Sequence, residues 1–255
     1  MSVWSARRQV LYTLVILLVI FGVVGLFLIA NQKKPTCFDG KKNQNELDVD
    51  CGGACTKVCQ LETSELVKRW ARVFRVRDGL YDVAARIDNP NIFGIGELAY
   101  HFKLYDAENT LVREARGTTF VNPDQSFIVL STGVETGFQV PVKAFVEITG
   151  QSEWVRYGEY KRPTFVVKDK TLTLEPKPRL AVRIGNDSLF DVENVEVTAI
   201  VLDQEGTAIG VSKSSISTLD AGKTEDIFFT WPEQFTGEPK IVEVYPRINT
   251  TKGVK

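Results

Sequence analysis

Residues 83–110 read VAARIDNPNIFGIGELAYHFKLYDAENT, and residues 180–207 read LAVRIGNDSLFDVENVEVTAIVLDQEGT. A shift of the chain by 97 residues, without a gap, superposes the two segments and gives eight identities within the 27 positions 84–110. The identical pairs are Ala84/Ala181, Arg86/Arg183, Ile87/Ile184, Asn89/Asn186, Phe93/Phe190, Asp106/Asp203, Glu108/Glu205 and Thr110/Thr207. Such a repeat predicts two copies of one structural unit.

Apolar and polar residues alternate in both copies, and the alternation keeps its register under the same shift. The coinciding apolar positions are Val83 with Leu180, Ala85 with Val182, and Ile87 with Ile184. Alternation with a period of two is typical of strands that bury one face. Because a slip of one residue would turn every side chain to the other face, we expect the two copies to bury the same positions.

Strand-like segments and turn residues continue on both sides of the quoted stretches, from residue 60 to the end of the repeat. In the first copy we predict strands at 69–76, 80–88, 98–105, 110–121, 125–131 and 142–149. In the second copy we predict them at 164–174, 179–185, 193–202, 207–218, 223–230 and 240–246. Each copy contains short strands over about 100 residues and shows no helical pattern. This predicts an all-β fold of two tandem Ig-like β-sandwiches.

Several short motifs recur around these strands. Arg-Ile-x-Asn stands at 86–89 and 183–186, Leu-Tyr-Asp stands at 104–106, and LDAGKTEDIFF occupies 219–229. The pattern resembles the bacterial Ig-like or FxLYD-type domains of envelope proteins, and the resemblance implies a sandwich fold and a place in the cell envelope. The first copy departs from it at 121–130, where VNPDQSFIVL lacks the glycine of the second copy.

Residues 10–30 form an apolar run of 21 residues without a charge. A helix needs roughly 20 such residues to cross a bilayer. Arg7 and Arg8 precede the run, which favours a cytoplasmic N-terminus, whereas Lys33 and Lys34 after it weaken that signal. A cleaved signal peptide is the alternative, but its apolar core would be shorter. We predict a single-pass protein of the cell membrane, with residues 1–9 cytoplasmic and the rest of the chain extracytoplasmic beyond the span.

All four cysteines lie in residues 37–59, CFDGKKNQNELDVDCGGACTKVC, at Cys37, Cys51, Cys55 and Cys59. Disulfides persist outside the reducing cytosol, so this cluster supports the extracytoplasmic placement. We predict a small knot with two disulfides, for which four cysteines allow three pairings. A Cys₄ zinc site is the alternative, although the spacing fits zinc motifs poorly. The stretch also resembles a cysteine-rich acidic motif found beside such β domains in bacterial surface proteins.

The knot is rich in oxygen donors of the kind that calcium prefers. They are Asp39, Asn43, Asn45, Glu46, Asp48 and Asp50. The order of these residues is not that of an EF-hand loop. Two interpretations stay open, a calcium site and a solvated acidic turn whose side chains bind backbone amides.

Other chemistry finds little support in the sequence. The net charge of −1 leaves no basic footprint for a nucleic acid. His101 is the only histidine, and alternation places it on the outer face of its strand, where we expect a solvent-exposed side chain. Serine or cysteine hydrolase chemistry would need that histidine. We therefore expect a protein that is not an enzyme.

Three further features carry predictions. Residues 68–77, KRWARVFRVR, are a first strand or a short amphipathic helix. Their arginines would contact acidic polymers or lipid headgroups, or would protect a sheet edge from aggregation. Asn186-Asp187-Ser188 and Asn249-Thr250-Thr251 match N-glycosylation acceptors.

The predicted domain limits are 31–62 for the knot, 63–162 and 163–248 for the two sandwiches, and 249–255 for a frayed tail. The proline after Arg162 marks the boundary between the sandwiches. We expect a membrane-anchored, extracytoplasmic binding, adhesion or scaffolding protein of the cell envelope, held in the membrane by residues 10–30. Its partner would be an envelope protein or a surface polymer. The alternative is a structural subunit of a secretion or pilus assembly, engaged through the transmembrane helix.

Overall fold

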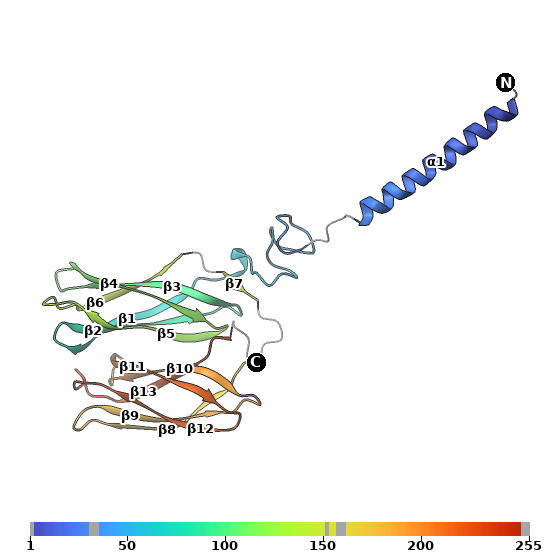
Figure 1. Cartoon of the computed structure of the whole chain (residues 1–255). Coiled ribbons are helices and arrows are strands. Elements are labelled where there is room, and N and C mark those ends of the chain that lie inside the picture. The colour runs from blue at the N-terminus through green and yellow to red at the C-terminus, as the bar shows by residue number, and fades with distance from the viewer. Residues whose placement is uncertain (1–2, 31–35, 151–152, 157–161, 251–255) are drawn as a thin grey trace. The chain divides into compact units, whose positions relative to one another are not determined.

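The computed structural model describes residues 3–30, 36–150, 153–156 and 162–250 (Figure 1). Parts of the predicted N-terminus, knot and tail, at 1–2, 31–35 and 251–255, lie outside the described residues. Helix α1 (Val3–Ala30) contains the apolar run. Among the described residues, no helix is found that is long and apolar enough to span a membrane. The membrane-spanning role of residues 10–30 stays a prediction.

Residues up to Gly53 and residues from Ala54 onward form two compact units. The division falls inside the predicted knot, and the domain limits given above stay predictions. Residues 54–62 of the predicted knot belong to the β unit. There the Val58 amide donates to the carbonyl of Trp154 at 3.0 Å, and Arg156 donates to Glu62 at 3.0 Å.

The first copy of the repeat contains seven strands in two sheets. They are β1 (Val67–Arg77), β2 (Leu80–Asn89), β3 (Gly94–Tyr105), β4 (Leu111–Val121), β5 (Gln125–Glu135), β6 (Lys143–Thr149) and β7 (Trp154–Val155). One sheet has the order β1-β2-β5, and the other has the order β4-β3-β6 with β7 paired to β3. The basic stretch at 68–77 is therefore a strand, not a helix.

The second copy contains six strands in two sheets. They are β8 (Phe165–Thr173), β9 (Arg179–Asn186), β10 (Val192–Leu202), β11 (Ala208–Leu219), β12 (Thr224–Thr230) and β13 (Ile241–Arg247). The sheet orders are β8-β9-β12 and β11-β10-β13. The 97-residue shift carries β1–β6 onto β8–β13 and reproduces both sheet orders. Every predicted strand is present, and the prediction of an all-β fold is confirmed.

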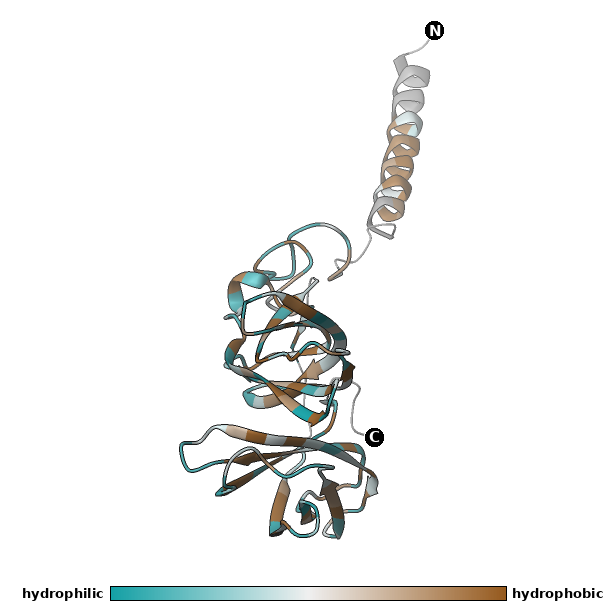
Figure 2. Ribbon diagram, turned by 90° about the vertical axis from the view of Figure 1, so that its left-hand side faces the viewer, coloured by the Kyte–Doolittle hydropathy of each residue, from teal (hydrophilic) through white to brown (hydrophobic). Residues whose placement is uncertain are grey.

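Each copy has its own apolar core at equivalent positions. Ile87 and Ile184 are both fully buried, Ile87 in the core of the first copy and Ile184 in that of the second. In Figure 2 hydrophobic residues follow the strands of both copies. The shared alternation therefore places the same positions inside both sandwiches, as the repeat predicted.

The identical pair Asn89 and Asn186 makes equivalent hydrogen bonds in the two copies. Asn89 is buried and its amide nitrogen donates to the carbonyls of Phe93 and Asn122, at 2.8 Å each. Asn186 is fully buried and donates to the carbonyls of Phe190 and Leu219, at 2.9 Å each. Asn186 also matches an N-glycosylation acceptor, but its side chain is buried and holds two backbone segments together inside the fold.

Asp106 and Asp203 fix the turn that follows the longest shared strand. The Oδ1 atom of Asp106 accepts from the amides of Glu108 at 3.1 Å and Thr110 at 2.7 Å. Asp203 accepts from Glu205 and Thr207 at the same two distances. Short side chains of this kind stabilise turns by binding amides two residues and more ahead. The identities at these two pairs, Asn89/Asn186 and Asp106/Asp203, are thus structural.

The two copies pack against each other through a third apolar cluster. The sheet β1-β2-β5 lies over the sheet β11-β10-β13, as Figure 1 shows. The buried members of the cluster are Ala84, Ile128, Ile200, Leu202, Ala208 and Val211. Strand β10 is consequently buried on both faces over most of its length. The sequence analysis did not identify this contact.

Polar groups fasten the two copies at the ends of this interface. Arg247 is 7% exposed and donates to Thr119 Oγ1 at 2.7 Å in the first copy and to Glu196 at 3.1 Å in its own. Asn122 donates to the carbonyl of Ile248 at 3.0 Å and accepts from the hydroxyl of Thr250 at 2.6 Å. The prediction of a frayed tail is wrong for residues 249 and 250, because Thr250 is buried against the first copy.

Candidate functional site

The predicted calcium ligands lie in a loop in which carboxylates accept backbone hydrogen bonds. Asp50 accepts from the amides of Asp39 at 3.0 Å and Gly40 at 3.0 Å. Asp39 accepts from the Lys41 amide and from the Asn43 side chain, both at 2.9 Å. The hydrogen bond from Asn43 lowers the pKa of Asp39. These two acids therefore close the loop on its own backbone.

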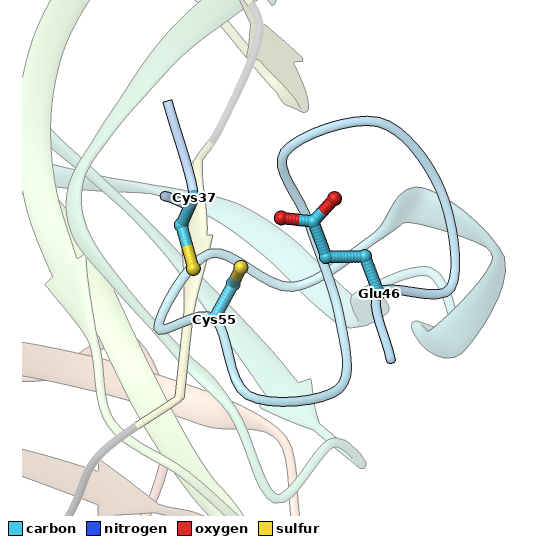
Figure 3. A group of neighbouring side chains, drawn as sticks. All are labelled: Cys37, Glu46 and Cys55. Carbon is cyan, nitrogen blue, oxygen red and sulfur yellow. The ribbon is translucent and has the colours of Figure 1, made fainter. Parts of the chain in front are cut away.

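Glu46 is the buried acid of this loop. Its side chain is drawn in Figure 3, where the loop curves around the carboxylate. The residue is 5% exposed, and Oε2 accepts from the Asn43 amide at 3.0 Å. Asn45 adopts a positive φ, and its carbonyl lies 2.1 Å from where a Cβ on Gly53 would stand. Glycine at 53 is thus required by the close approach of the backbone.

All four cysteines are in disulfides, as the sequence predicted. A disulfide sulfur is not a thiolate, so the zinc alternative does not fit this chain. The same reason removes Cys37 and Cys55, drawn with Glu46 in Figure 3, as thiolate ligands.

Calcium remains a prediction. Among the described acids of the loop, no three of Asp39, Glu46, Asp48 and Asp50 place carboxylate oxygens within 4.8 Å of one another. Asp48 binds the amide of Val49 at 2.8 Å, and each of the other three accepts a backbone amide as described above. All four carboxylates thus accept hydrogen bonds from backbone amides.

His101 lies on the outer face of β3, as alternation predicted, but it is only 8% exposed. The expectation of a solvent-exposed histidine is wrong. Its partners across the sheet are Arg116 on β4 and Glu147 on β6. Long charged side chains cover neighbouring groups with their apolar stems. The Nε2 atom lies 3.2 Å from Glu114 Oε2, so the imidazole is part of a charged surface network.

A groove between the two copies, with a volume of about 520 Å³, is one of the concave surfaces of the β unit. Three strands at sheet edges border it, namely β1, β6 and β11. Every residue from Trp70 to Val76 lines it, and so does every residue from Ala208 to Ser212. Consecutive residues of a strand point to opposite faces of the sheet. Because residues of both faces line the groove, it runs along the edges of β1 and β11.

Aromatic rings form much of the groove wall. Trp70 and Phe74 pair across the sheet with Arg86 and Asp82, so they lie on the face of β1 that is turned to the second copy. Both pack against the apolar cluster between the copies. Phe145 of β6 is 57% exposed and lies edge-on to Tyr105 with ring centroids 5.7 Å apart.

On the opposite wall, Trp231 and Phe235 pack edge to face with centroids 5.1 Å apart. The indole of Trp231 donates to the carbonyl of Val211 at 3.0 Å. A Cβ on Gly210 would stand 2.5 Å from Phe235, so glycine makes room for this ring. In the first copy the shift places Arg113 at this position and Phe138 at that of Phe235, and Phe138 is fully exposed. The wall is therefore specific to the second copy.

Most charged groups of the groove are already paired. Arg75 binds Asp78 at 2.7 Å and lies 3.7 Å from Glu233. Burial raises the pKa of Asp82, which accepts the amide of Gly133 at 2.8 Å. Among the described residues, Arg72 forms no ion pair although it lines the groove. Lys143 lines the groove as well and forms no ion pair among the described residues, but it donates to Asn109 Oδ1 at 2.8 Å.

Sequence reasoning singled out the basic strand but not the groove. Its walls come from residues 70–76, 142–145, 207–212 and 230–236, which only the stacking of the two copies brings together. No protein-family model and no curated protein matches this chain.

Proposed function

We propose that this protein is a membrane-anchored, extracytoplasmic binding protein of the cell envelope and not an enzyme. Three features support the proposal. The uncharged run 10–30 lies in a helix, and the four cysteines behind it are in disulfides. The β repeat resembles the Ig-like or FxLYD-type domains of bacterial envelope proteins. In this proposal the sandwiches are Ig-like and lie outside the membrane.

The groove between the copies is the observation that carries the binding role. It joins exposed aromatic surface, an unpaired cation and two strand edges on a single face. Buried contacts on both sides of the interface hold the two copies together, which keeps the groove in shape. Binding sites are typically concave, apolar and formed before the ligand arrives.

Capture of partners from the envelope tests this proposal. The detergent-solubilised full chain should retain a stoichiometric envelope partner, and Phe145→Ala should lose most of it, because this ring is exposed and contributes binding area. Leu189→Ala is the matched control, since Leu189 is almost fully exposed and lies outside the groove. Equal capture by wild type, Phe145→Ala and Leu189→Ala would contradict a role for the groove.

The assembly-subunit alternative predicts a different result in the same experiment. If the chain is engaged through residues 10–30, replacing them by an unrelated apolar helix of equal length should abolish capture. Under our proposal that replacement should leave capture intact.

A further inference from the structure

We propose that the free edge of β1 binds an extended acidic peptide, which adds to the sheet β1-β2-β5 as a further strand. The inference rests on the proposed binding function and names the class of partner. It follows from three observations, which concern the strand edge, its charge and the rings beside it.

The edge of β1 is available for pairing. In the described sheet β1 pairs with β2 on one side only. Alternate residues of such an edge strand direct their N–H and C=O groups away from the sheet. The groove follows this edge from Trp70 to Val76, which is long enough for a strand of ordinary length. An extended peptide laid in the groove would satisfy these backbone groups.

The charge of β1 selects an acidic partner. The strand contains Lys68, Arg69, Arg72, Arg75 and Arg77 and no acidic residue. Arg69 and Arg75 are paired with acids of this chain. Among the described residues, Lys68, Arg72 and Arg77 form no ion pair, and Arg72 lines the groove. Complementary charge across an interface favours association and excludes partners of like charge.

The aromatic side chains that line the groove offer the added strand a packing surface. Trp70, Arg72 and Phe74 share one face of β1, so an acid opposite Arg72 would be flanked by two aromatic side chains. Phe145, which is 57% exposed, also lines the groove. Cations whose only role is to protect a strand edge from aggregation need no aromatic side chains beside them. The combination favours a peptide in which acidic and apolar residues alternate.

Fluorescence anisotropy with a defined probe tests the proposal. The probe is a fluorescein-labelled peptide of alternating Glu and Val, about eight residues long. It should bind the full chain in detergent, whereas the corresponding Lys-Val peptide should not. Methylation of alternate backbone nitrogens should abolish binding, because it removes the hydrogen-bond donors that pair with the edge. Amide hydrogen exchange of residues 70–76 should slow when the Glu-Val peptide is bound.

Two variants distinguish peptide binding in the groove from a nonspecific effect of surface charge. Arg72→Glu should weaken binding of the Glu-Val peptide by about tenfold or more. Arg116→Glu should leave it unchanged, since Arg116 is an exposed arginine on another edge strand, β4, and does not line the groove.

Equal effects of the two variants, or equal binding of the methylated peptide, would overturn strand addition at β1. So would binding of phosphatidylglycerol vesicles that depends on Arg72 together with no binding of the peptide. If the peptide fails while Phe145→Ala still loses the envelope partner, the peptide class alone is wrong and the proposed function stands.

Discussion

At the scale of single residues, the chain shows how a repeat is preserved by buried polar side chains. The buried amides of Asn89 and Asn186 each donate to two backbone carbonyls. Their importance was visible in the sequence as an identity, but their role was not. The sequence repeat shows that the two copies share an asparagine, whereas only the structure shows which carbonyls its side chain binds.

Replacement of one of these amides should destabilise the fold. Asn186→Ala leaves the carbonyls of Phe190 and Leu219 without their donor inside the protein. We expect a loss of about 2–4 kcal/mol in the free energy of unfolding, measured by urea titration with tryptophan fluorescence. Gln204→Ala, an exposed change in a turn, is the control and should stay within about 0.5 kcal/mol of wild type. A small effect at Asn186 would contradict its structural role.

Asp88 should contribute to stability in a pH-dependent way. Burial raises its pKa, but hydrogen bonds from Ser126 and Arg69 outweigh burial and hold the pKa below its ordinary value. An acid with a depressed folded pKa stabilises the fold above its unfolded pKa of about 3.9, and the stabilisation is lost as the pH falls through the folded value. Asp88→Asn should therefore lower stability at pH 7 and flatten the fall between about pH 5 and the folded pKa. An unchanged acid limb of the stability curve in this variant would refute the assignment.

At the scale of elements, alternation predicted every strand of the two main sheets of each copy. It succeeded because each strand has one core-facing side, as with Ile87 and Ile184. It failed where a second layer covers the outer face. Ala84 and Ile200 are fully buried between the copies, and His101 is covered by charged neighbours. Alternation along one strand carries no information about what lies on its outer side.

The acidic loop was only partly predictable for a related reason. The four cysteines predicted disulfides, and the structure confirms them. The six oxygen donors predicted either calcium or backbone capping, because both uses need the same side chains. Their positions show capping, with Asp50 bound to the amides of Asp39 and Gly40.

A calcium titration tests the remaining hypothesis. If the loop binds calcium, the ion should raise the melting temperature of the full chain, and Asp48→Asn should reduce that rise. Extracellular calcium modules bind with dissociation constants of roughly 0.1–1 mM, so the titration should reach several millimolar. Glu205→Gln, in a distant turn of the second copy, is the matched control. No melting shift and no heat of binding over this range would leave backbone capping as the only role of the acids.

At the scale of the whole molecule, the two copies form one compact unit and not two separate domains. The apolar cluster between them and the hydrogen bonds of Arg247 and Asn122 join the copies. A groove built from both copies therefore keeps its width only while the copies stay together.

This architecture predicts cooperative unfolding. Ile200→Ala removes buried volume from the interface and should cost about 2–5 kcal/mol. Both copies should then unfold in one transition at a lower urea concentration. Ile184→Ala, in the core of the second copy alone, should cost a similar amount in the same single transition. Two separate transitions in the wild-type protein would contradict a single cooperative body.

Site-directed photo-crosslinking in the native cell tests the binding role of the groove most directly. A photoreactive amino acid at position 145, whose wild-type phenylalanine is exposed in the groove, should give one discrete adduct with an envelope protein. The same group at position 189, which is more exposed than position 145 and lies outside the groove, should give none. The absence of an adduct at position 145, or the same adduct from both positions, would contradict the account.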